Sequence, residues 1–188
     1  QRTFAGAGLT DRVMHLANGH DLSWRENAPA KQPSPEVRIG YVGQIAEHKG
    51  LHTLIDGFRL ANLGSRARLD IWGDTSLHRA YADRLRDQTS HDAAIGWRGA
   101  FGRADIGRVL AGIDVLVVPS NWHENAPLVI QEAFASGIPV VATNLGGMAE
   151  AVTDGVNGLL FARNDAADLA HQLARMVDEP GLRALLAA

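Results

Sequence analysis

Short apolar runs alternate with amphipathic stretches along the chain from Val37 onward. Apolar runs bounded by turn residues are typical of buried strands, and apolar residues three and four positions apart are typical of helices. The pattern predicts strands at 37–43, 68–74, 94–99, 113–120, 138–143 and 157–161. It predicts helices at 48–61, 77–88, 104–112, 127–136, 146–152 and 165–177, with a new helix starting after the break at 179–181.

Several of these strands are too apolar to have one face in water, above all the strand at 113–120. Buried strands that alternate with helices predict an α/β fold, a Rossmann-like open parallel sheet with helices on both faces. In such sheets ligands bind beyond the carboxyl ends of the strands. The loops in which we expect a site therefore follow Gly43, Gly73, Trp97, Ser120 and Thr143.

Residues 1–35 have a different pattern. A short strand is expected at Val13–Leu16, closed by a turn at Asn18–Gly19, and FAGAGL near the start is interpreted as a loop. Three prolines without periodicity in ENAPAKQPSP indicate a linker. We therefore expect a linker over 1–35 and one folded domain over 36–188, a length that supports a single core.

Composition excludes some classes of site. A net charge of −3 with scattered basic residues gives no indication of a nucleic-acid partner. The absence of cysteine excludes disulfides and thiolate metal sites. His48 and His52 lie four apart but lack an HExxH pattern and an obvious third ligand, so no metal site is predicted. No apolar run is long enough to span a bilayer and no signal peptide is recognised, while the absence of cysteine fits a cytosolic protein.

The segment HENAPLVIQEAFASGIPVV, residues 123–141, predicts a loop, a helix and a strand. Pro127 suits the first helical position because it has no N–H to leave unpaired, and Asn125 then lies near the N-cap. Glu124 stands outside the helix, at the ligand-binding end of the sheet. Unpaired amides and a partial positive charge make the helix start suitable for an anion such as phosphate.

Glu132 lies inside this helix, on the same face as Leu128 and Ala135, with apolar residues on the neighbouring faces. A helix that is apolar all round is usually buried, and a buried carboxylate costs several kcal/mol unless it receives hydrogen bonds. Three interpretations remain open. Glu132 is a surface residue on a narrow polar stripe with Gln131, or it pairs with a lysine or arginine, or it binds paired hydroxyls of a ligand such as a ribose.

A second segment, GYVGQIAEHKG, ends the first predicted strand with Gly40 and Gly43 and opens the next helix at Lys49–Gly50. It is neither the dinucleotide pattern GxGxxG nor the P-loop pattern. It allows the backbone to approach a ligand closely and places one cation beside it. A lysine at a helix start is most often solvated, so this segment alone identifies no site.

These segments resemble the C-terminal domain of retaining glycosyltransferases of the GT-B fold, family 4. GYVGQIAEHKG is followed by VVPSNWHENAPLVIQEAFASGIPVVATNLGGMAEAVTDGVNGLLF, and the likeness runs from about Val37 to Phe161. HLANGHDL resembles the hinge before that domain. The E-x7-E spacing of Glu124 and Glu132 is specific because EAFASGIPVVAT, GG and DGVNGLL follow it.

The resemblance implies a nucleotide-sugar donor site over 36–188. Glu132 would bind ribose hydroxyls, Glu124 would bind hydroxyls of the transferred hexose, and Lys49 would counter the charge of the leaving diphosphate. Glu124 and Lys49 are thus the expected catalytic residues. The other expected donor-binding residues are Gly43, Gln44, Asn125, Ala126, Leu128, Val129 and, through backbone near it, Arg98. Gln44 stands where the family often has arginine, and Pro127 where glycine is common.

The resemblance also implies a UDP-, GDP- or ADP-sugar as donor, no cofactor, no metal, and a separate N-terminal domain that binds the acceptor. Without that domain, and with a shortened terminal helix, the chain is expected to bind donor nucleotide and to transfer no sugar. The family implies the cytoplasm, with peripheral association at the inner membrane as a variant. The alternatives are a nucleotide-sugar epimerase and a non-catalytic nucleotide-sugar-binding module. A Rossmann oxidoreductase is disfavoured because no dinucleotide fingerprint follows the first strand.

Overall fold

The structure is a computed structural model that describes residues 21–187. The predicted strand at Val13–Leu16, the turn at Asn18–Gly19 and the FAGAGL loop lie outside the described residues.

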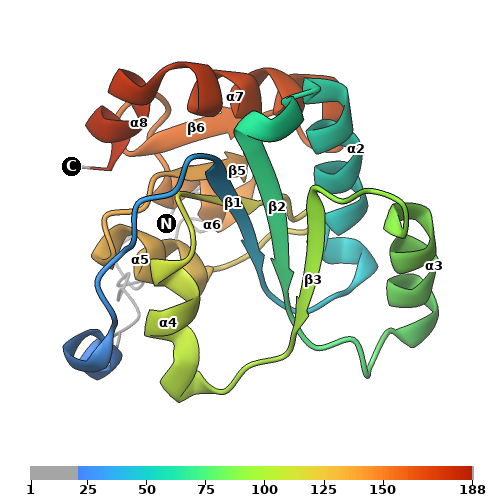
Figure 1. Cartoon of the computed structure of the whole chain (residues 1–188), viewed down its shortest axis with the longest axis horizontal. Helices are drawn as coiled ribbons and strands as arrows, with labels where there is room; N and C mark the ends of the chain where they lie inside the picture. Colours follow the sequence, from blue (N-terminus) through green and yellow to red (C-terminus); the bar gives the residue numbers. More distant parts are fainter. Residues whose placement is uncertain (1–20, 188) are drawn as a thin grey trace, which may run out of the picture.

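A single sheet of six parallel strands forms the centre of the molecule, in the order β3-β2-β1-β4-β5-β6 (Figure 1). The strands are β1 (Val37–Val42), β2 (Ala67–Trp72), β3 (Ile95–Gly99), β4 (Val115–Val118), β5 (Val140–Thr143) and β6 (Gly158–Phe161). Each lies inside its predicted range except β2, which begins one residue earlier at Ala67, and the predicted open parallel sheet is confirmed. The strand order reverses at β1: β2 and β3 are added on one side of it, and β4, β5 and β6 on the other. Folds of this kind bind their ligands at such a reversal, here between β1 and β4.

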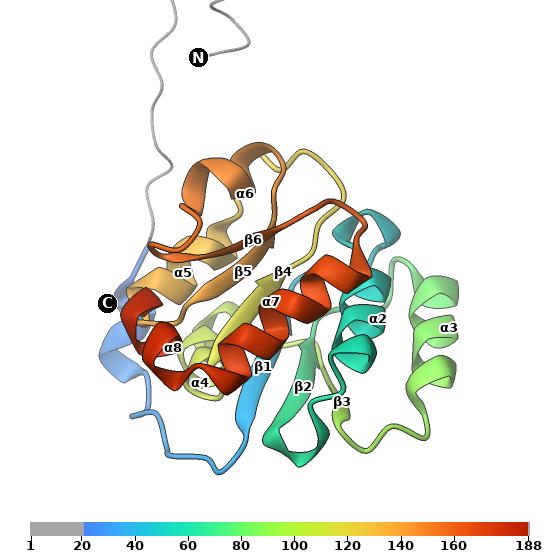
Figure 2. The same cartoon turned by 90° about the horizontal axis from the view of Figure 1, so that it is seen from above.

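Helices cover both faces of this sheet (Figures 1 and 2). One face carries α2 (Leu51–Ala61), α3 (Arg79–Thr89), α7 (Ala166–Asp178) and α8 (Pro180–Leu186). The other carries α4 (Ile106–Ala111), α5 (Leu128–Ala135) and α6 (Gly146–Ala151). Short 3-10 turns η2 (Ser23–Asn27), η3 (Glu47–Lys49), η4 (Gly64–Arg66) and η5 (Arg103–Asp105) complete the described elements.

The alternation of side chains along each strand divides the core into two layers. Leu69 and Ile71 of β2 are fully buried under the helices of the first face. In β4, Leu116 and Val118 pack beneath α4 and α5 on the opposite face. The central strands are therefore buried on both sides, as their sequence predicts. Among the described residues, no helix is both long and apolar enough to cross a bilayer.

Part of the predicted linker is docked on the domain. Trp24 of η2 is 9% exposed and packs in the same apolar cluster as α4. Gly107 of α4 allows this close approach, because a Cβ there would lie 2.9 Å from the Cβ of Ala28. The division of the chain between residues 35 and 36 stays a prediction, but residues 23–28 belong to the packed body.

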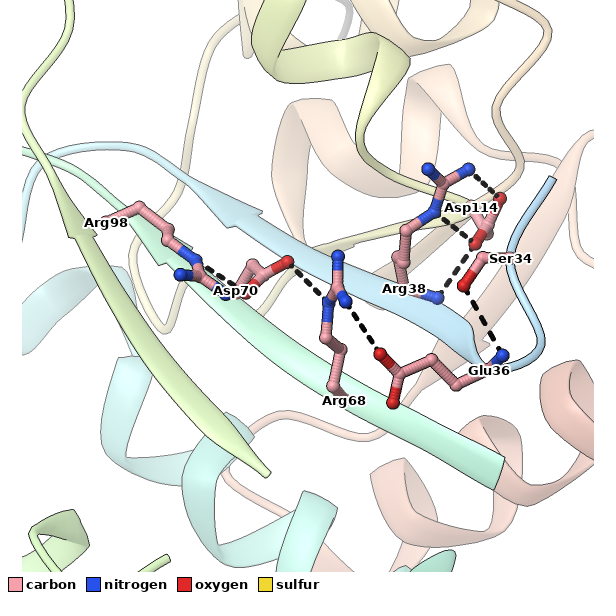
Figure 3. A network of polar contacts seen from close by, with 7 residues as sticks. All are labelled: Ser34, Glu36, Arg38, Arg68, Asp70, Arg98 and Asp114. Atoms are coloured by element: carbon pink, nitrogen blue, oxygen red, sulfur yellow. Dashed lines mark hydrogen bonds and ion pairs between the residues drawn. The ribbon is translucent and has the colours of Figure 1, made fainter. Parts of the chain in front are cut away.

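Charged side chains replace apolar ones on part of the second face, where a network of ion pairs lies along β1, β2 and β3 (Figure 3). Arg38 binds Asp114 through Nε and Nη2 at 2.8 and 2.9 Å. Arg68 bridges Glu36 at 2.6 Å and Asp70 at 3.0 Å. Arg98 completes the row by pairing with Asp70 at 2.7 Å. Asp70 and Arg38 are buried, and each is compensated by an opposite charge, as buried ions require.

Replacing Asp114 with asparagine is expected to destabilise the fold by about 2 kcal/mol at pH 7. Burial alone would raise the pKa of Asp114, but hydrogen bonds from Arg38 and Lys31 outweigh it and lower that pKa from 3.8 to about 2. A depressed pKa stabilises the fold above pH 4, and this contribution is lost as the pH falls towards 2. Urea unfolding between pH 7 and pH 3 should show the difference from wild type shrinking. The exposed Asp83→Asn variant should show no such trend.

Candidate functional site

A pocket of about 280 Å³ opens at the carboxyl ends of β1 and β4. Its walls come from the ends of these strands, the η3 turn, and the start of α5. The lining residues are Tyr41, Val42, Gly43, Lys49, Val117, Val118, Pro119, Ser120, Glu124, Ala126, Pro127, Leu128 and Val129. The pocket thus lies at the crossover point of the sheet and has a mostly apolar wall with one charged end.

That charged end is an ion pair between Lys49 and Glu124. The Lys49 Nζ lies 2.6 Å from Oε1 of Glu124, and the two side chains are 28% and 17% exposed. The Ser120 hydroxyl lies within hydrogen-bond distance of the same oxygen, at 2.9 Å. The two residues predicted to carry the chemistry, 75 positions apart in sequence, therefore share one pocket.

Backbone contacts hold the loop of Lys49 against the loop after β4. The Asn121 amide donates to the carbonyl of His48 at 2.9 Å. Gly50 follows Lys49 with a φ of +70°, and a Cβ there would lie only 1.9 Å from the carbonyl oxygen of Pro119. Only glycine accepts both the left-handed backbone and this contact. The Lys49–Gly50 end of the segment GYVGQIAEHKG is thus explained by the close packing that positions Lys49.

The first turn of α6 packs against the loop that carries Glu124. The Gly147 amide donates to the carbonyl of Glu124 at 2.7 Å, and a Cβ at Gly147 would lie 2.3 Å from the carbonyl oxygen of Asn125. Gly146 and Gly147 therefore allow the first turn of α6 to lie directly on the backbone of the loop that contains Glu124. This contact fixes the loop that carries the carboxylate.

Gly43 lines the pocket, whereas Gln44 beside it does not. The carbonyl of Gln44 accepts a hydrogen bond of 2.7 Å from the Tyr41 hydroxyl, which holds the turn after β1. Burial raises the pKa of the Tyr41 phenol well above its usual range, and the charges of Tyr81 and Glu124 act in the same direction. Tyr41 therefore stays a hydrogen-bond donor at any physiological pH. Sequence analysis did not single it out.

The start of α5 differs from the prediction by one residue. Pro127 is the N-cap, with an extended ψ of 106°, and α5 begins at Leu128. No described side chain caps the helix, so the expectation that Asn125 provides an N-cap bond is wrong. Because the amide of Ile130 already donates to the Pro127 carbonyl, the amides of Leu128 and Val129 remain as the unpaired donors of the first turn. Both residues line the pocket.

Glu132 is buried, with 4% of its surface exposed, so the interpretation as a surface glutamate is wrong. Its Oε1 pairs with Nη1 of Arg103 in η5. The arginine alternative is therefore realised, with a partner that sequence analysis did not identify. Glu132 does not line the pocket itself, but it lies one turn along α5 from Leu128, about 6 Å away along the helix axis.

The sequence-predicted residues thus fall into two groups. The pocket contains Gly43, Lys49, Glu124, Ala126, Leu128 and Val129. Gln44, Arg98, Asn125 and Glu132 are outside its lining. The Arg98 side chain belongs to the charged network on β3 and pairs with Asp70 (Figure 3), so any role in binding would fall to backbone near it.

A larger pocket, about 410 Å³, lies at the other end of α5, between η2 and α4. It is lined by Trp24, Arg25, Lys31 and the backbone around Gly137, among others, and by no carboxylate. It faces the carboxyl end of α5, where the helix dipole is negative. The smaller pocket suits an anionic ligand better, because it combines the positive end of the α5 dipole with Lys49.

Within residues 21–187, no three histidine, aspartate or glutamate side chains group together in a way that could hold a metal ion. His52, one of the paired histidines of the sequence, instead has its Nδ1 2.9 Å from the Tyr81 hydroxyl.

Known proteins similar to this chain are glycosyltransferases. Over 179 residues the chain is 31% identical to glycogen synthase of Mycobacterium tuberculosis, covering 93% of this chain and 42% of that protein. It is 34% identical to D-inositol 3-phosphate glycosyltransferase of Stackebrandtia nassauensis, covering 83% of this chain and 37% of the relative. The chain therefore spans about two fifths of these curated relatives.

Solved structures with the same fold include Anabaena Alr3699/HepE in complex with UDP and glucose. That structure has a TM-score of 0.74 and 28% identity, covering 82% of this chain and 42% of the other. The C-terminal domain of the group 1 glycosyl transferase LpcC from Francisella tularensis has a TM-score of 0.69 at 22% identity, covering 91% and 88% of the two chains. The latter likeness supports the fold alone.

The fold is therefore that of the C-terminal half of a GT-B glycosyltransferase, as the resemblance implied. The model of the family Glycosyl transferases group 1 matches residues 23–187, nearly the whole of the described chain. The match begins at η2, in agreement with the packing of Trp24 on α4. This chain belongs to the glycosyl transferases group 1 family.

Proposed function

We propose that this chain is the nucleotide-sugar donor-binding domain of a retaining glycosyltransferase that transfers a hexosyl group. The observation that carries the proposal is the pocket in which Lys49 and Glu124 meet the start of α5. A cation and unpaired amides suit a diphosphate, and a carboxylate beside them suits sugar hydroxyls.

The diphosphate would lie between Lys49 and the first turn of α5. The Lys49 ammonium has three N–H donors, and Glu124 uses one of them. The others remain for phosphate oxygens. During transfer, negative charge grows on the departing diphosphate, and fixed donors already aimed at it stabilise that charge without reorganisation. The reaction proposed here is metal-independent, with Lys49 and α5 as the counter-charges, and requires no cofactor.

The hexose would lie at Glu124. Its Oε1 is engaged by Lys49 and Ser120, which holds the carboxylate in one position. A fixed carboxylate that accepts from two hexose hydroxyls orients the anomeric carbon towards the acceptor, and orientation of this kind lowers the barrier. Glu124 and Lys49 are therefore the proposed catalytic residues.

The nucleoside would extend along α5 to Glu132. Leu128 lines the pocket, and Glu132 follows it one turn later on the same helical face. A ribose linked to the diphosphate would reach the Glu132 carboxylate from there, and backbone near Arg98 would face the base. Alr3699/HepE is a relative of this fold whose crystals contained UDP and glucose, which supports a UDP-sugar first among UDP-, GDP- and ADP-sugars.

The acceptor would bind to a second domain, since the chain spans only 42% of the glycogen synthase relative. We infer that the isolated chain binds donor and transfers no sugar. Two other functions use the same pocket: epimerisation of the nucleotide sugar, and nucleotide-sugar binding without chemistry. Incubating the chain with UDP-N-acetylglucosamine and analysing the products would reveal an epimerase. The same incubation with UDP-glucose and acceptor sugars would reveal transfer.

Calorimetric titration with UDP, GDP and ADP is the direct test. One of the three is expected to bind. The Glu132→Gln variant is expected to bind that nucleotide about 10-fold or more weakly, because a charged hydrogen bond to the ribose is lost. Glu179→Gln, at the exposed junction of α7 and α8, is the matched control and should bind like wild type. Binding that is equal in wild type and Glu132→Gln would contradict the proposed place of the ribose.

A further inference from the structure

Arg103 is the residue of the site that the resemblance to the family does not account for. It begins η5, in the loop after β3, and its Nη1 pairs with Oε1 of Glu132. Its side chain is 56% exposed, whereas that of Glu132 is 5% exposed. A second nitrogen, Nη2, lies 3.4 Å from the backbone carbonyl of Asp21. An arginine that is itself more than half exposed therefore lies against a buried carboxylate.

Electrostatics favours keeping the ion pair between Arg103 and Glu132 when a nucleotide binds. Hydroxyl groups are neutral, so two of them cannot replace a guanidinium as the counter-ion of a buried carboxylate. The guanidinium has five N–H donors, and the contacts with Glu132 and Asp21 use two of them. Among the described residues, the hydrogen bond that the Glu132 carboxylate receives is at Oε1, from Arg103, which leaves Oε2 as the acceptor for a ligand. The pair thus presents an acceptor and spare donors side by side.

We propose that Arg103 and Glu132 together form hydrogen bonds with the two hydroxyls of the ribose. Arg103 is then a residue that determines specificity for a ribonucleotide. Oε2 of Glu132 accepts a hydrogen bond from one hydroxyl, and Arg103 donates to the oxygen of its neighbour. This inference rests on the proposed function. In this arrangement one of the two ribose hydroxyls is bound by the arginine, whereas a glutamate alone would accept hydrogen bonds from both.

The proposal makes the affinity depend on Arg103 and on a ribose hydroxyl jointly. Removing that hydroxyl from the nucleotide should matter in the wild-type chain and cease to matter once Arg103 is gone. An arginine that merely blocks the carboxylate gives the opposite result, since its removal would tighten binding. An arginine that merely stabilises the loop gives equal losses for every nucleotide. The three cases are therefore separable by measuring a cycle of variants and analogues.

The experiment measures affinities of UDP, 2′-deoxy-UDP and 3′-deoxy-UDP by calorimetry for wild type, Arg103→Ala, Arg103→Lys and Arg108→Ala. Arg108 is the matched control, since it is 62% exposed and pairs only with Asp105 in the described part of the chain. Wild type and Arg108→Ala should prefer UDP over each deoxy analogue by about 10-fold. Arg103→Ala should bind UDP about 10-fold more weakly and prefer it over one analogue by less than about 3-fold.

Arg103→Lys keeps the charge without the planar fork, and should restore part of the preference. Its thermal midpoint, compared with wild type, checks that the fold is intact. An unchanged preference over both analogues in Arg103→Ala, or tighter binding of UDP, would overturn the role of Arg103. If Glu132→Gln still lowers the affinity for UDP in that case, the proposed function stands and this inference alone fails. A wild-type chain that binds none of UDP, GDP and ADP would overturn both.

Discussion

Replacing Lys49 with alanine is expected to weaken UDP binding by about 10- to 100-fold. The ammonium sits in the pocket, 2.6 Å from Glu124, and is the cation that would meet the diphosphate there. A charge-assisted hydrogen bond is worth about 1.5–3 kcal/mol. The loss should be much smaller for UMP, which lacks the terminal phosphate. Calorimetric titration of both nucleotides with wild type and variant measures this difference.

The chain provides its own control, because its second lysine lines the other pocket. Lys31 is 39% exposed and pairs with Asp114 at 3.0 Å. Lys31→Ala removes the same charge at the far end of α5 and should leave UDP affinity within about 2-fold of wild type, since separated exposed charges are screened. Equal losses in the two variants would show that net charge, not the position of Lys49, controls binding.

The second large effect is expected at Gly50, where alanine should destabilise the fold by about 3–4 kcal/mol. Part of this is backbone strain at a φ of +70°, and the rest is the overlap of a Cβ with the Pro119 carbonyl oxygen, which lies 1.9 Å away. Relief of the overlap would move η3 away from the loop after β4. Because Lys49 precedes Gly50 directly, UDP affinity should also fall.

Gly64→Ala separates the two contributions to this loss. Gly64 has a similar φ of +59°, yet a Cβ there would have no heavy atom within 4 Å. It should lower the free energy of unfolding by only about 1 kcal/mol and leave UDP affinity unchanged. Urea unfolding of the two variants measures the difference. If Gly50→Ala were no less stable than Gly64→Ala, the contact with Pro119 would not hold Lys49 in place.

The arrangement of strands and helices could be predicted because it depends on local patterns. Five of the six strands lie inside their predicted ranges and β2 begins one residue earlier, since a strand buried on both faces needs a continuous apolar run. Trp24 shows where this reasoning fails. It stands in an irregular stretch just before three prolines, yet packs against α4. A single aromatic in a 3-10 turn has no periodicity, so only the three-dimensional surface that it covers shows that it is buried.

The site was predictable in part for a related reason. Lys49 and Glu124 both follow the carboxyl ends of central strands, and topology alone places such residues together. The N-cap of α5 was placed one or two residues too early, because Pro127 fits both the first helical position and the cap. The partner of Glu132 could not be identified, since Arg103 lies in an exposed loop, and an arginine there is usually solvated.

The central claim is that a nucleotide diphosphate binds along α5, from Lys49 to Glu132. Amide chemical-shift mapping during titration of the isotope-labelled chain with UDP tests it most directly. The largest shifts are expected at Gly43, Lys49, Leu128, Val129 and Arg103. Largest shifts at Trp24, Lys31 and Gly137 instead, around the pocket of about 410 Å³, would contradict a donor site along α5.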